Sequence, residues 1–167
     1  SGLSFLFPCF SVYFFPHLSP GCILIASHKT RTNGKRNMAN INTKKGVIGI
    51  LTGGGDVPGL NPAIRAVTIR ALREGYQVVG LRRGWAGVTE IVREEGYDNS
   101  ENYILLNEHV VNRAGRTGGT FLHTSRTRPS HMKKGAVPSH LQGTYGAETN
   151  DLTPEVIKNL DWLGIDY

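Results

Sequence analysis

Two glycine-rich stretches carry the residues that suit phosphate binding. The first covers residues 52–59 and follows an apolar run, 47–51, of the length expected for a buried parallel strand. Asn61 is a typical helix N-cap and Pro62 suits a first helical position, so we expect a helix to begin there. Glycines allow close backbone approach, and the N–H groups at a helix N-terminus favour anions. This order of strand, glycine turn and helix predicts a site for phosphate or a phosphorylated ligand.

The glycine turn departs from two common phosphate-binding motifs. No lysine follows its glycines, as a P-loop requires. Pro58 stands at the third glycine position of a dinucleotide fingerprint that would begin at Gly53 and Gly55. A turn that serves only tight packing is the simpler alternative. We favour phosphate binding because the turn lies between a strand and a helix N-terminus.

The second glycine-rich stretch, residues 112–129, combines arginines with glycines and small hydroxyl residues. Guanidinium groups match phosphate oxygens in bidentate geometry, and small neighbours allow close approach. We therefore expect Arg126 to contact phosphate rather than to form a surface salt bridge. Both interpretations stay open for the other three arginines of the stretch, Arg113, Arg116 and Arg128.

Both stretches resemble signatures of the phosphofructokinases. Thr-Gly-Gly-Gly-Asp-Val-Pro-Gly-Leu-Asn-x-Ala-Ile-Arg at 52–65 is similar to the first signature, and Gly-Gly-Thr-Phe-Leu-His-Thr-Ser-Arg at 118–126 is similar to the second. The two matches stand in the family order, which makes them more specific together than apart. By this resemblance, residues 46–167 are the N-terminal part of a phosphofructokinase catalytic domain.

The resemblance implies phosphoryl transfer from ATP or pyrophosphate to the 1-hydroxyl of fructose 6-phosphate, giving fructose 1,6-bisphosphate in glycolysis. It also implies Mg²⁺ as a cofactor, a cytoplasmic location and a homo-oligomer for the full-length enzyme. In such a 6-phosphofructokinase, positioning and charge stabilisation dominate catalysis.

The same resemblance assigns roles to individual residues. The backbone N–H of Gly54 would contact the transferring phosphoryl group, Arg126 would bridge the phosphates and stabilise transition-state charge, and Thr127 would neighbour the nucleotide or diphosphate. The family's metal-binding Gly-Gly-Asp segment and its Thr-Ile-Asp-Asn-Asp segment with the catalytic base are expected beyond Tyr167. No general base or metal ligand is therefore assigned in this chain, and we expect the chain alone to be inactive. Gly53, where many ATP-using bacterial members have serine, favours pyrophosphate or a mixed donor.

Two other classes of function stay open. Another nucleotide-binding α/β enzyme, such as an oxidoreductase with an altered glycine loop, would need an acidic residue about 20 residues after the glycines. That region holds Leu81, Arg82 and Arg83, which weakens the dinucleotide interpretation although an arginine suits a 2′-phosphate. The second alternative is a non-catalytic phosphate-binding fragment.

Apolar patterns predict an α/β fold with a Rossmann-like, three-layer parallel sheet, incomplete at the C-terminus. After the first strand we expect a helix over 62–74 and a strand over 77–81, joined by a right-handed crossover. Residues 103–106 suggest a short peripheral strand, and residues 130–150 suggest a loop beside the site. The loop over 82–87 holds a tryptophan that either anchors the loop or meets a ligand.

A last helix is expected to start with Thr153 as its cap and to end at Gly164. The residues after it, 165–167, resemble the approach to a third core strand. The apolar face of this helix is formed by Val156, Ile157, Leu160 and Leu163.

The net charge of +6 comes from the first part of the chain. Residues 1–45 hold six of the 19 basic residues and no acidic one, so residues 46–167 are neutral. We therefore predict neither a nucleic-acid nor a membrane partner. Prolines interrupt the apolar runs of residues 1–45 well before the ~18 residues that a spanning helix needs. We expect a disordered or non-native leader over 1–45, with residues 1–37 foreign to a natural protein that starts at Met38; a poorly formed targeting segment is the alternative.

Both cysteines, Cys9 and Cys22, lie in this leader. From Gly46 onward neither a disulfide nor a thiolate metal site can form, which suits a reducing compartment. Three histidines, His123, His131 and His140, lack helical spacing and a nearby carboxylate, which argues against a zinc site formed by them.

Overall fold

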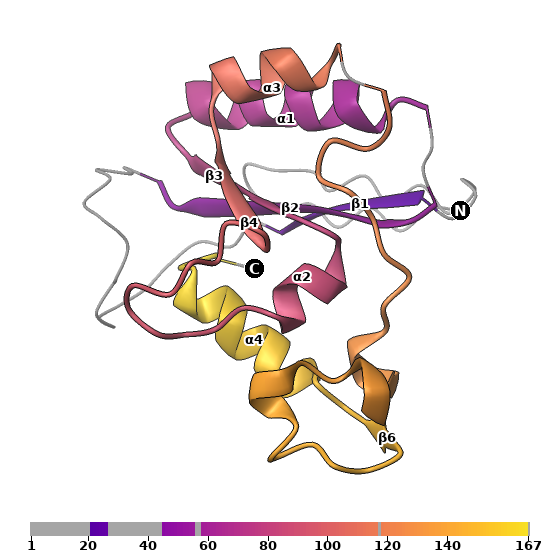
Figure 1. Ribbon diagram of the computed structural model, residues 1–167. Helices are drawn as coiled ribbons and strands as arrows, with labels where there is room; N and C mark the ends of the chain where they lie inside the picture. Colours follow the sequence, from indigo (N-terminus) through magenta and orange to yellow (C-terminus); the bar gives the residue numbers. More distant parts are fainter. Residues whose placement is uncertain (1–20, 27–44, 56–57, 117, 167) are drawn as a thin grey trace, which may run out of the picture.

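The protein has an α/β fold in three layers (Figure 1). The computed structural model describes residues 21–26, 45–55, 58–116 and 118–166. A four-stranded sheet forms the middle layer, with two helices on each of its faces. One face carries α1 (Leu60–Arg73) and α3 (Glu108–Ala114), and the other carries α2 (Trp85–Thr89) and α4 (Thr153–Trp162).

The sheet is mixed, which corrects the expected parallel sheet. Its strands, in spatial order, are β1 (Gly21–Ala26), β2 (Val47–Gly54), β3 (Gln77–Leu81) and β4 (Tyr103–Leu106). Strands β2 and β3 are parallel and are joined by α1, as predicted, whereas β1 and β4 pair antiparallel with their neighbours. Leu81 at the end of β3 pairs with Tyr103 at the start of β4. The connection therefore leaves and re-enters the sheet at the same edge, and no crossover is made.

Strand β2 and helix α1 are longer than predicted. Strand β2 continues through the first glycines to Gly54, and α1 begins at Leu60 rather than Pro62. Gly59 is the N-cap and has a left-handed conformation with φ of 99°, so the expected cap, Asn61, lies inside the first turn. The predicted stop is confirmed, because Gly75 follows the helix with φ of 85°.

Alternating residues of β2 supply both faces of the core. Ile48 and Ile50 pack under α1 with Ile64, and Leu51 packs on the other face with Val156 of α4. Trp85 is partly buried against this second cluster, which supports its interpretation as a loop anchor. The two packed faces hold the carboxyl end of β2 rigidly in place.

The segment between α3 and α4 is more ordered than the expected loop. It contains a two-stranded sheet, β5 (Met132–Lys133) and β6 (Thr149–Asn150), and three short 3₁₀ turns, η1 (Pro129–His131), η2 (Lys134–Ala136) and η3 (Ser139–Leu141). A small apolar cluster of its own, Met132 with Val137 and Leu152, explains this order.

Helix α4 differs in two details from its prediction. Thr153 is its first helical residue rather than its cap, and the N–H of Thr153 donates to the carboxylate of Asp151 at 2.9 Å. Ile157 is 43% exposed and so is not part of the packed face. After the helix, Ile165 is buried against Gly49, and the N–H of Asp166 donates to the carbonyl of Val47 at 3.4 Å. The chain thus reaches the edge of β2, as the expected approach to the sheet requires.

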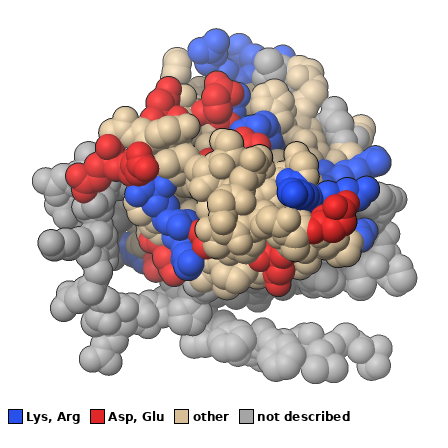
Figure 2. Space-filling model, turned by 60° about the horizontal axis from the view of Figure 1, so that its bottom comes forward, with Lys and Arg blue, Asp and Glu red and all other residues tan. Residues whose placement is uncertain are grey.

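Surface charge is mixed on the face shown in Figure 2, where acidic and basic side chains are interspersed. Within the described ranges, no helix has both the length and the apolar character needed to cross a membrane.

Candidate phosphate-binding site

The carboxyl end of β2 meets the second glycine-rich stretch directly. Gly53 and Ser125 form a parallel β-bridge, and the N–H of Gly54 donates to the carbonyl of Ser125 at 3.0 Å. We call residues 52–54 together with 123–125 the strand-end junction. The structure therefore brings together the two motifs that the sequence singled out.

Two hydroxyl side chains close the strand-end junction. Thr52 is fully buried, and its Oγ1 donates to the carbonyl of His123 at 2.7 Å. The Thr124 hydroxyl donates to the carbonyl of Gly54. Each such hydrogen bond contributes a net ~1 kcal/mol, so together they hold the two segments in one register.

Arg126 and Thr127 follow the strand-end junction immediately. Arg126 is exposed and Thr127 is partly buried. No hydrogen bond or ion pair joins the Arg126 guanidinium to another side chain in the described parts of the chain. The backbone is held at Ser125, one residue before Arg126. A solvent-facing guanidinium at this position can bind phosphate oxygens in bidentate geometry.

The glycine turn leads from the strand-end junction to the N-terminus of α1. Gly54 has φ of 93°, a conformation that side chains disfavour, and Gly59 repeats it at the helix cap. The first turn of α1 contains no acidic residue, so no carboxylate there competes with an anion for the positive end of the helix dipole. Asp56 and Val57, in the middle of the turn, lie outside the described residues.

The N–H of Gly54 is engaged in a different contact from the one that the resemblance implies. It donates to Ser125 rather than pointing to an unoccupied position. A phosphate oxygen could accept from Gly54 only by sharing this N–H or by replacing the Ser125 carbonyl. The phosphate contact of Gly54 stays a prediction.

Asn61 holds the start of the second glycine-rich stretch against α1. Its Nδ2 donates to the carbonyl of Gly119 at 2.7 Å, and its Oδ1 accepts from the N–H of Phe121 at 2.8 Å. Asn61 is 8% exposed. The residue expected as a helix cap thus clamps two segments that are far apart in the sequence.

The four arginines of the second stretch do not share one environment. Arg113 lies on α3 and Arg116 just beyond its end. Arg126 and Arg128 follow the strand-end junction, and both are exposed. Of the four, Arg126 is the one that directly follows the strand-end junction.

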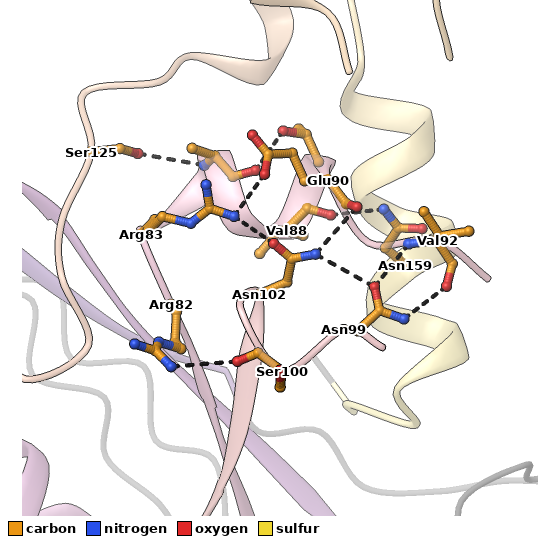
Figure 3. A network of polar contacts seen from close by, with 12 residues as sticks. Arg82, Arg83, Val88, Glu90, Val92, Asn99, Ser100, Asn102, Ser125 and Asn159 are labelled. Atoms are coloured by element: carbon orange, nitrogen blue, oxygen red, sulfur yellow. Dashed lines mark hydrogen bonds and ion pairs between the residues drawn. The ribbon is translucent and has the colours of Figure 1, made fainter. Parts of the chain in front are cut away.

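The turn after β3 is the third segment at the site, and its polar contacts are drawn in Figure 3. Residues 82–84 and the first three residues of α2, 85–87, follow the carboxyl end of β3 and are together called the Arg83 turn, so the loop expected over 82–87 is partly helical. The N–H of Ala86 donates to Ser125 Oγ at 3.4 Å, and the guanidinium of Arg83 contacts Glu90 and Asn102. Ligands of open α/β sheets bind at carboxyl ends of strands such as these.

A cluster of charged side chains surrounds Glu155 of α4. Glu155 is buried, and hydrogen bonds from Lys158 at 2.8 Å and from Arg93 at 2.7 Å keep the pKa of its carboxyl below the ordinary value. Burial, and then the charge of Arg93, lower the pKa of His140. These contacts tie α4 to the segment after α2, and we interpret the cluster as structural.

Within the described ranges, no three His, Cys, Asp or Glu side chains gather to hold a metal ion. The Mg²⁺ that the resemblance implies stays a prediction.

The sequence did not reveal the residues whose contacts support the strand-end junction. Thr52, Thr124 and Ser125 lie inside the recognised motifs, but their mutual contacts span 70 residues or more and leave no local pattern. Arg83 and Asn102 lie outside both motifs. The paired small hydroxyl residues before Arg126 were the one available signal.

The family comparison covers most of the chain. A family model described as Phosphofructokinase matches residues 47–167. A crystal structure of Pichia pastoris phosphofructokinase in the T-state aligns with 50% of this chain and 8% of that chain, at 30% sequence identity and a TM-score of 0.41.

Curated relatives match over shorter ranges. A pyrophosphate–fructose 6-phosphate 1-phosphotransferase of Dictyoglomus thermophilum is 45% identical over 82 residues, which are 49% of this chain and 21% of the relative. An ATP-dependent 6-phosphofructokinase 3 of Streptomyces coelicolor is 42% identical over 89 residues, or 53% of this chain and 23% of the relative. The chain thus spans less than a quarter of the length of these relatives.

Proposed function

Because the chain belongs to the phosphofructokinase family, we propose that it supplies phosphate-binding residues for phosphoryl transfer to the 1-hydroxyl of fructose 6-phosphate. The observation that carries this proposal is the strand-end junction. It joins both glycine-rich motifs at the carboxyl end of β2 and leaves the exposed Arg126 as the next residue. A guanidinium held beside a glycine turn suits a transferring phosphoryl group.

Arg126 acts in this proposal as the charge-stabilising residue. Its planar fork binds two phosphate oxygens at once, and the strand-end junction fixes the backbone before it, so little reorganisation is needed as charge develops. Thr127, partly buried beside it, lies next to the donor phosphates. The N–H of Gly54 joins them when a phosphate oxygen shares or replaces its contact with Ser125.

The phosphoryl donor is ATP or pyrophosphate, and the relatives include enzymes named for each. We propose pyrophosphate as the preferred donor, because Gly53 replaces the serine of many ATP-using members. The family also leads us to propose a cytoplasmic homo-oligomer for the complete enzyme. The donor preference is tested by isothermal titration calorimetry, in which pyrophosphate and ATP are titrated separately into the chain. Tighter binding of ATP would contradict the preference for pyrophosphate.

The proposed function is tested by Arg126→Lys in a catalytically complete chain that carries these residues. Lysine keeps the charge but not the bidentate fork, so we expect the turnover number to fall by about 10²–10³. The KM for fructose 6-phosphate should change much less, because the arginine acts mainly in the transition state.

The matched control is Arg73→Lys, an exposed arginine in the last turn of α1. This variant should keep the wild-type turnover number. An unchanged turnover number in Arg126→Lys would end the catalytic assignment, whereas equal losses in both variants would point to a general effect of lysine.

A further inference from the structure

The Arg83 turn lies against both halves of the strand-end junction. The N–H of Arg83 donates to the carbonyl of Leu122 at 2.8 Å, just before the 123–125 segment. A Cβ built on Gly84 would lie 2.7 Å from the carbonyl oxygen of Thr52 and 3.2 Å from Ser125 Oγ. The backbone of the turn is therefore packed directly on β2 and on the second glycine-rich stretch at once.

This backbone has an unusual conformation at two successive residues. Arg83 has φ of 56°, which non-glycine residues rarely adopt, and Gly84 has φ of 56° and ψ of −137°. Such conformations persist only where surrounding contacts hold them. Arg83 is held by its backbone N–H, which donates to Leu122, and by the contacts of its side chain.

The side chain of Arg83 is held by two acceptors (Figure 3). Its Nη2 donates to Glu90 Oε2 at 2.6 Å and to Asn102 Oδ1 at 2.6 Å. Asn102 is 6% exposed, and its Nδ2 donates to the carbonyl of Glu90 at 3.3 Å. The side chain of Asn102 is thus tied to the backbone of Glu90 as well as to the guanidinium of Arg83.

We propose that Arg83 is a positioning residue for the phosphate site. Its contacts with Glu90 and Asn102 hold the Arg83 turn in place. The turn then supports Ser125 through the N–H of Ala86 and through the close packing of Gly84. Ser125 in turn fixes the backbone from which Arg126 extends. The role given to Arg126 rests on the proposed function, but the mechanical link from Arg83 to Ser125 does not.

The mechanical link is tested by amide hydrogen exchange of the ¹⁵N-labelled chain. The reporter is the N–H of Gly54, which donates to Ser125, and Ile50 in the centre of β2 is the internal reference. In Arg83→Met, which keeps the apolar stem but loses the donors, we expect the protection of Gly54 to fall about fivefold or more relative to Ile50. Arg83→Lys, which can still reach one acceptor, should recover part of this loss.

The matched control is Arg70→Met, which breaks an exposed ion pair with Glu74 on α1. It should leave the ratio of Gly54 to Ile50 protection unchanged. Glu90→Gln, which keeps an acceptor but loses the charge, serves as the second variant if Arg83→Met fails to fold, and it should give a smaller fall. An unchanged ratio in Glu90→Gln and in any folded Arg83 variant would overturn the inference, as would an equal loss at Gly54 and Ile50.

Titration with inorganic pyrophosphate separates this inference from the proposed function. If the wild-type chain shows no pyrophosphate-dependent shift of the Arg126 amide, the proposed function loses its support, while the exchange of Gly54 still decides the mechanical link. If the wild-type chain binds, the dissociation constant in Arg83→Met should rise severalfold. Unchanged pyrophosphate binding together with a lowered protection of the Gly54 amide would overturn the inference that Ser125 positions Arg126.

Discussion

Removal of the Asn61 amide should detach the second glycine-rich stretch from α1. Asn61→Ala deletes both hydrogen bonds, to Gly119 and from Phe121. Each is worth a net ~1 kcal/mol, and backbone groups left unpaired near a buried position cost more, so we expect a loss of about 2–3 kcal/mol in the free energy of unfolding. Urea unfolding followed by tryptophan fluorescence measures this loss.

A second substitution at Asn61 tests the geometry of the contact. In Asn61→Asp one carboxylate oxygen still accepts from Phe121, but the other faces the carbonyl of Gly119 where an amide donated at 2.7 Å. Burial raises the pKa of such a carboxyl above the ~3.9 of an unfolded chain. The destabilisation is therefore largest at pH 7 and shrinks as the pH falls towards 4, where the protonated group can donate to Gly119.

The matched control is Asn107→Ala, which removes a single capping hydrogen bond at the start of α3. An exposed cap of this kind is worth ~1 kcal/mol. If Asn61→Ala costs no more than Asn107→Ala, the clamp does not hold the two segments together. Equal losses for Asn61→Asp at pH 7 and at pH 4.5 would show that the Gly119 contact is not made.

Two further predictions concern the packing of α4 and the edge of the sheet. Glu155→Gln should cost about 2 kcal/mol at pH 7, a reduced value because Arg93 and Lys158 are partly exposed. Because the folded pKa of Glu155 is lowered, its stabilisation is present above pH ~4.3 and is lost as the pH falls through the folded pKa. Urea unfolding at pH 3 should therefore show a smaller difference in the free energy of unfolding between the wild type and Glu155→Gln. A difference that does not depend on pH would contradict the ion-pair account. Deletion of residues 1–37 removes β1 from β2 and should make the chain self-associate as its concentration rises, which light scattering detects; a shortened chain that stays monomeric would show that β1 does not protect this edge.

The sequence predicted the elements that have a local pattern. The apolar runs at 47–51 and 77–81 became β2 and β3, and the motif residues 118–126 reached the end of β2. Helix α3 was missed because its seven residues are too few to show an apolar period. Its only clear local signal is the cap Asn107, which accepts from Val110.

Contacts between distant residues could not be read in the same way. Asn61 fits a helix cap by type and position, yet Gly59 takes that place because its left-handed conformation allows the turn to close earlier. The directions of β1 and β4 depend on where a connection re-enters the sheet, and residue types along the strand do not encode this. The antiparallel pairing of Leu81 with Tyr103 is visible only in three dimensions.

The hydroxyl residues before Arg126 have a structural reason that is independent of phosphate. Strand β3 pairs with β2 only as far as Leu51, and β2 continues for three residues beyond it. The backbone groups of Thr52–Gly54 on that side need partners, and residues 123–125 supply them through the Ser125 carbonyl and the Thr124 hydroxyl. A strand that outruns its neighbour therefore requires a second segment at its carboxyl end. A Cβ built on Gly53 would lie 3.9 Å from the Ser125 carbonyl oxygen, an ordinary contact, so the backbone pairing rather than this glycine sets how close the second segment comes.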